Sequence, residues 1–88
     1  MSESYEEFAE SMKGSLLRSI ISKGLFPKGF ELAGSAVEML DAIEEEAYSV
    51  ADSYFDSGEG IGSSDMNAFI RNIFRSLGEP DVFGWNKS

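Results

Sequence analysis

The amino-acid sequence contains no cysteine and no histidine among its 88 residues. Disulfide bonds, thiolate nucleophiles, the usual zinc sites and imidazole general bases are therefore excluded, and we expect no metal or other cofactor. The acidic start of the chain has neither the basic residues nor the apolar run of a signal peptide. No apolar stretch approaches the roughly 20 residues of a membrane-spanning helix. We expect a cytoplasmic protein with no membrane contact.

Basic residues are also scarce. Seven Lys and Arg stand against 16 Asp and Glu, which gives a formal net charge of −9. Direct binding to nucleic acid or to an anionic membrane is disfavoured, because both need cationic side chains to neutralise phosphate. Hydrophobic residues nevertheless make up 42% of the chain, a fraction typical of globular proteins. The length predicts a single helical domain spanning residues 1–88.

Apolar residues recur at helical spacing through the sequence, without the alternation typical of strands. We predict a small all-α bundle with an aromatic C-terminal tail, whose three helices span about residues 5–23, 30–56 and 64–77. Ser4 and Glu7 have the spacing of a capping box at the start of the first helix, and Gly24 is a natural stop after it. Pro27 predicts a turn in the connection over residues 25–29.

The third predicted helix is capped by Ser63 or Ser64 and stopped by Gly78. In the tail that follows, Phe83 and Trp85 either cover the core or anchor a partner. Arg71 and Arg75, one turn apart on the third helix, either pair with the middle helix or form a small basic patch.

The middle helix carries an apolar seam with alternating steps of four and three residues. Its members are Ala36, Leu40, Ile43, Ala47, Val50 and Tyr54. A seam of this kind is typical of helices that pair with other helices. One hypothesis is therefore a helical assembly or adaptor protein that forms a homo- or hetero-oligomer through apolar surfaces.

The acidic residues of the middle helix have a regular spacing, within an interval from Lys28 to Arg71 that contains no other basic residue. A step of seven residues places side chains nearly above one another, about 10.5 Å apart along a helix. Four acids follow this step, Glu59 would continue it into the glycine-rich loop, and two more acids lie beside the row. The candidate partner-binding residues are Glu31, Glu38, Asp41, Glu45, Asp52, Asp56 and Glu59.

Two interpretations of this acidic row compete. It is either a solvated helix face or a docking surface for a basic protein, such as a nucleic-acid-binding enzyme. In the second case its carboxylates stand in for the phosphates of DNA or RNA. The chain is similar in size, charge and helical content to small phage proteins that block restriction or CRISPR enzymes in this way. That resemblance implies an anti-defence inhibitor that acts as a nucleic-acid mimic, and a homodimer that aligns two rows is compatible with it.

Other chemistry fits the sequence less well. The segment from Asp52 to Ile61 lacks the ligand spacing of a calcium-binding EF-hand loop. The glycine-rich loop before the third helix follows a helix rather than a strand and has no P-loop lysine. Glu45 and Asp52 form a carboxylate pair, but on a convex helix surface, so we do not expect catalysis.

Overall fold

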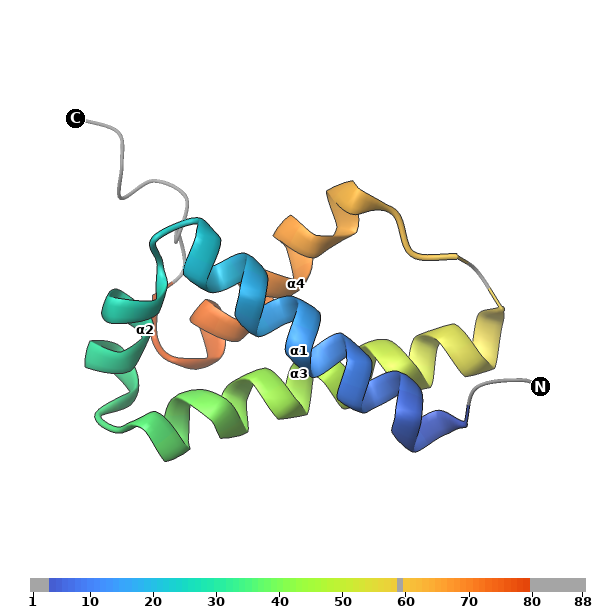
Figure 1. Cartoon of the computed structure of the whole chain (residues 1–88), viewed down its shortest axis with the longest axis horizontal. Coiled ribbons are helices and arrows are strands. Elements are labelled where there is room, and N and C mark those ends of the chain that lie inside the picture. Colours follow the sequence, from blue (N-terminus) through green and yellow to red (C-terminus); the bar gives the residue numbers. More distant parts are fainter. Residues whose placement is uncertain (1–3, 59, 80–88) are drawn as a thin grey trace.

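Four helices follow one another in the part of the chain that the structure describes, residues 4–58 and 60–79. In this computed structural model they are α1 (Tyr5–Ser22), α2 (Phe26–Ala33), α3 (Ala36–Ser57) and α4 (Ser63–Ser76) (Figure 1). No strand occurs among the described residues, so the predicted all-α fold is confirmed, with one helix more than expected. None of these described helices is long and apolar enough to cross a membrane.

The start of α1 has the predicted capping box. The backbone N–H of Glu7 donates to Ser4 Oγ at 3.2 Å, and the backbone N–H of Ser4 donates to Glu7 Oε1 at 3.2 Å. These bonds satisfy N–H groups that have no acceptor inside the helix. The bond from the Ser4 backbone also lowers the pKa of Glu7. Beyond α1, Gly24 adopts a φ of 73°, which strains any residue with a side chain.

The predicted helix over 30–56 is wrong at its start, because the chain forms two helices there. Pro27 lies in the first turn of α2, where its missing N–H costs nothing and its fixed φ suits the helix. The predicted turn over 25–29 is thus largely helical. Gly34 then ends α2 with a φ of 89°. Ser35 caps the start of α3, since its Oγ accepts the backbone N–H of Glu38 at 3.2 Å.

The start of α4 also differs from the prediction. The helix begins at Ser63 after Gly62, so neither Ser63 nor Ser64 is the residue before it. Asp65 supplies the capping contact, because its Oδ2 accepts the backbone N–H of Gly62 at 2.9 Å. The predictions for Phe83 and Trp85 lie outside the described residues.

The hydrophobic core lies where α1, α3 and α4 meet. Its largest fully buried side chains are Leu16, Ile20, Met39, Ile43, Ile70, Ile73 and Phe74. Burial of each contributes on the order of 1.5–3 kcal/mol. The short helix α2 closes one end of this core (Figure 1). It approaches α3 closely at Gly29, where a Cβ would overlap the side chain of Met39.

The predicted apolar seam of the middle helix is only half correct. Its members Ile43, Ala47 and Val50 are buried, but Ala36 and Leu40 are exposed. The reason is the path of α1, which crosses α3 at an angle and covers its C-terminal half (Figure 1). The buried side of α3 therefore shifts around the helix along its length.

Candidate functional site

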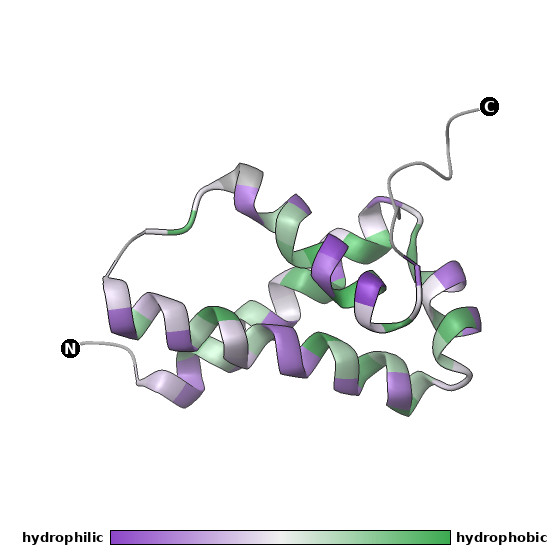
Figure 2. Cartoon of the chain, turned by 180° about the vertical axis from the view of Figure 1, so that it is seen from behind, coloured by the Kyte–Doolittle hydropathy of each residue, from purple (hydrophilic) through white to green (hydrophobic). Residues whose placement is uncertain are grey.

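Five of the predicted partner-binding residues form one exposed face of α3. We call these residues the acidic face: Glu38, Asp41, Glu45, Asp52 and Asp56. At about 100° of rotation per residue they fall within an arc of about 60°. This arc is roughly opposite to the core residues Met39, Ile43 and Ala47. The same amphipathic packing that buries those side chains turns the carboxylates toward solvent, and Figure 2 shows hydrophilic segments recurring along α3 between hydrophobic ones.

Glu31 and Glu59 do not share this helix as predicted. Glu31 lies on α2, and the break at Gly34 and Ser35 separates it from α3. Its carboxylate is 4.0 Å from Lys28 Nζ. The row with a step of seven residues is therefore reduced on α3 to Glu38, Glu45 and Asp52. Glu59 lies outside the described residues.

No described lysine or arginine forms an ion pair with the acidic face. Lys13 lies 3.3 Å from Glu10 and 3.4 Å from Glu44, which is on α3 but outside the acidic face. The pKa of Lys13 is raised by its hydrogen bond to Glu10 and then by the charge of that residue. None of the ion pairs among the described residues therefore offsets the repulsion between the carboxylates of the acidic face.

The charge density of the acidic face can be compared with that of DNA. Glu38 and Asp56 lie about 27 Å apart along the axis, at about 1.5 Å per residue. Five carboxylates over this length recur about every 7 Å, against one phosphate about every 3.4 Å along one strand of B-DNA. The acidic face therefore has about half the linear charge density of a single DNA strand.

A cluster of aromatic rings borders the acidic face where α1 crosses α3. The rings of Phe8 and Tyr54 stack with centroids 4.4 Å apart, and Phe55 meets Phe8 edge-on at 5.7 Å. Tyr5 lies 5.7 Å from Tyr48. The predicted apolar seam includes Tyr54, but it misses Tyr48 and Phe55. Their spacing of seven residues, on the side of α3 next to the acids, is the signal that could have found them.

The hydroxyl of Tyr5 joins this cluster to the acidic face. It donates a hydrogen bond to Asp52 Oδ1, across the junction of α1 and α3. This bond is the largest of the causes that raise the pKa of Tyr5, because ionisation of the phenol would lose it and place two negative charges side by side. One oxygen of Asp52 is thereby oriented by α1, while the side chain stays exposed.

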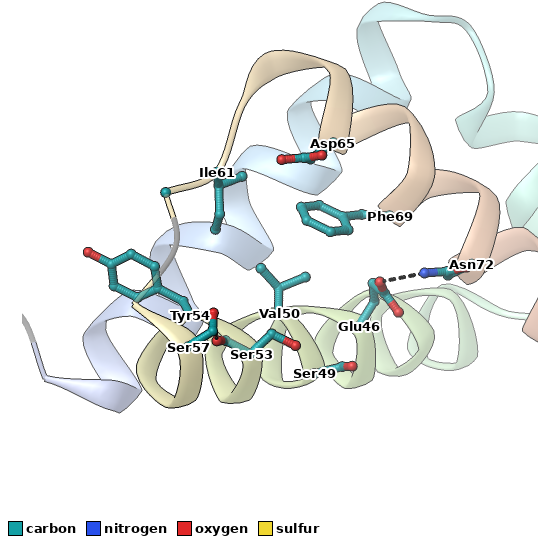
Figure 3. Close-up of a pocket in the computed structure, with 11 residues that line it drawn as sticks. Glu46, Ser49, Val50, Ser53, Tyr54, Ser57, Ile61, Asp65, Phe69 and Asn72 are labelled. Carbon is teal, nitrogen blue, oxygen red and sulfur yellow. Dashed lines mark hydrogen bonds between the residues drawn. The ribbon is translucent and has the colours of Figure 1, made fainter.

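On another side of α3 a hollow of about 270 Å³, with both polar and apolar lining, opens toward α4 (Figure 3). Val50, Ile61 and Phe69 contribute to its apolar part, and Ser49 and Ser53 line it along α3. At one end, Asn72 Nδ2 donates to Glu46 Oε2 at 3.1 Å. Burial raises the pKa of Glu46, and the bond from Asn72 opposes that rise. Sequence periodicity could not find this hollow, because Gly60 and Ile61, which lie outside the helices, also line it.

The two arginines of α4 lie on its exposed side. Arg75 Nη1 donates to Asn72 Oδ1 at 3.5 Å, so this contact lies within α4 rather than between helices. In the described ranges, 4–58 and 60–79, no three acidic side chains are arranged to hold a metal ion. Comparisons of the chain with protein-family models, curated proteins and solved structures give no significant match.

Proposed function

We propose that this protein is a small inhibitor that docks the acidic face of α3 on a basic surface of another protein. The observation that carries the proposal is the set of five exposed carboxylates on one arc of one helix, with no described cation pairing to them. A helix that needs acids only for solubility commonly interleaves both signs of charge. Here the helix tolerates like-charge neighbours, which cost a few tenths of a kcal/mol each.

The partner that best fits this surface is a nucleic-acid-binding enzyme. A rod of negative charge about 27 Å long resembles one strand of a nucleic acid in shape and sign, at about half its charge density. Electrostatic attraction would steer it into a cationic cleft, and the contact would weaken as salt screens it. The protein then works as a nucleic-acid mimic, of the kind that phages use against restriction or CRISPR enzymes. In this proposal it acts in the cytoplasm and has no catalytic activity of its own.

A second candidate function is assembly through apolar contacts. Val37 and Leu40 lie one turn apart on α3 and are 66% and 40% exposed. They lie outside the core and are available to a second copy or to another helical chain. Light scattering over a dilution series separates the two functions, because an apolar oligomer persists at high salt while an acidic contact does not.

The test is inhibition of DNA cleavage by a panel of purified bacterial restriction and CRISPR nucleases. The informative variant is Glu38→Lys with Glu45→Lys, which reverses two charges of the acidic face. Its matched control is Glu6→Lys with Glu31→Lys, which changes the net charge by the same amount at exposed positions on α1 and α2. Circular dichroism shows whether both variants keep the helical fold.

We expect the wild-type chain to inhibit at least one nuclease, and inhibition to fall steeply with rising salt. The variant with two reversed charges on the acidic face should bind at least about tenfold more weakly, equivalent to about 1.4 kcal/mol. The control should stay close to wild type. An equal loss of binding in both variants would show that only net charge matters. If the wild-type chain inhibited no nuclease of the panel, the proposal of a nucleic-acid mimic would be contradicted.

A further inference from the structure

The ring of Tyr48 has carboxylates before and after it on its own helix. Glu44 and Glu45 precede it by four and three residues, and Asp52 follows it by four. Residues three or four apart on a helix are surface neighbours, with Cβ atoms about 5–6 Å apart. Tyr48 is partly exposed, so its ring lies at the edge of the acidic face rather than in the core.

Two further rings extend this surface. The ring of Tyr5 is 5.7 Å from that of Tyr48, with the planes tilted by 43°, and 5.9 Å from that of Phe55. Tyr5 is 37% exposed and Phe55 is 45% exposed, so neither is sealed inside the protein. The three rings come from α1 and α3, which cross here (Figure 1). Their shared surface is apolar, and its neighbours on α3 are anionic.

Asp52 is also held in place at this point. The Tyr5 hydroxyl donates to its Oδ1, which restrains the carboxylate and leaves the second oxygen free of this bond. A carboxylate accepts several hydrogen bonds, so Oδ2 can receive a donor from outside the protein. An exposed ring face beside a positioned carboxylate favours a flat cation that stacks and donates hydrogen bonds at the same time.

We infer that Tyr48, together with Tyr5, Phe55 and Asp52, receives an arginine side chain of the basic partner. This inference rests on the proposed docking function and names the chemistry at one end of it. A guanidinium group stacks on an aromatic ring and pairs with a carboxylate through its planar N–H groups. A lysine ammonium is compact and more strongly hydrated, so it uses the carboxylates but gains less from the rings. On a nucleic-acid enzyme, the arginine would be one that otherwise contacts phosphate.

The experiment compares binding of the full chain to blocked oligoarginine and oligolysine peptides of equal length, at one low salt concentration. Tyr48→Leu removes the aromatic face and keeps an apolar side chain of moderate size, whereas Tyr48→Phe keeps the ring. Phe30→Leu is the off-site control, because Phe30 is a 43% exposed aromatic residue on α2. The measured quantity is the ratio of the two dissociation constants for each variant.

We expect the wild-type chain to prefer oligoarginine by about two- to five-fold, the range of an exposed cation–π contact. Tyr48→Phe and Phe30→Leu should keep this preference, and Tyr48→Leu should abolish it. Equal binding of the two peptides by the wild type overturns the arginine receptor but leaves the docking function intact. Persistence of the preference in Tyr48→Leu overturns it too.

Two further outcomes are decisive. If neither peptide binds, the docking function fails together with the inference. If Tyr48→Leu does not fold, the wild-type complex still decides, through the arginine Cδ protons in the nuclear magnetic resonance spectrum. An upfield shift of these protons on binding places them over an aromatic ring and supports the receptor, whereas an unchanged shift overturns it.

Discussion

Neutralising Asp41 should stabilise the protein, because this residue bears the most repulsion on the acidic face. Its neighbours at three or four residues are Glu38, Glu44 and Glu45. Glu44 is offset by Lys13 at 3.4 Å, which leaves two uncompensated like-charge pairs. At about 0.2–0.5 kcal/mol per pair, Asp41→Asn should raise the free energy of unfolding by about 0.4–1 kcal/mol. Asn and Asp have similar helix propensities, so the change isolates the charge.

The assay is urea unfolding monitored by circular dichroism, at low salt and again at about 1 M salt, where the Debye length is about 3 Å. The stabilisation should be present at low salt and largely disappear at high salt. Glu31→Gln is the control, because this residue has Lys28 nearby and no acid within four residues on either side. It should be neutral or slightly destabilising. The reasoning would be refuted if Asp41→Asn left the free energy of unfolding unchanged or lowered it at low salt. It would also be refuted if the stabilisation did not decrease at high salt.

Two glycines should respond in opposite directions to substitution by alanine. Gly34→Ala should destabilise the protein by about 1–2 kcal/mol, because Gly34 has a left-handed φ of 89°. Gly14 lies inside α1 with open space around it. Gly14→Ala should therefore stabilise the protein by up to about 1 kcal/mol. Urea midpoints check both, and a stabilising Gly34→Ala would disprove the break between α2 and α3. Separately, the raised pKa of Tyr5 means that its contribution to stability is present below pH 10 and is lost as pH rises through the higher folded-state pKa. The stability of Tyr5→Phe should therefore fall less above pH 10, and parallel pH profiles would count against the bond to Asp52.

Local patterns predicted those parts of the fold that depend on neighbouring residues. Helical spacing and the capping box of Ser4 and Glu7 determine α1 because the interactions are contained within one segment. The same reasoning failed at Pro27 and Gly34. A proline stops a helix from inside but starts one from its first turn, and the sequence does not say which role applies. Here Pro27 starts α2, and Gly29 of this helix packs against Met39 of α3. This tertiary contact accompanies the formation of α2.

The sequence also predicts only part of the candidate site. The exposed side of α3 follows from helical rotation, so the sequence alone assigns five acids to one face. The partners of that face could not, because the contact of Tyr5 with Asp52 joins residues 47 positions apart. The crossing of α1 over α3 brings Tyr48 and Phe55 beside it, and periodicity within one helix carries no information about that crossing.

In the proposed function, the acidic face of α3 is the surface that contacts a basic partner. Backbone amide chemical shifts, recorded while an inhibited nuclease or a basic peptide is added, test it most directly. We expect the largest changes at residues 38, 41, 45, 48 and 52 of α3 and at Tyr5 of α1, and we expect added salt to reverse them. Changes centred instead on α2, on α4 or on the hollow around Glu46 would contradict the claim.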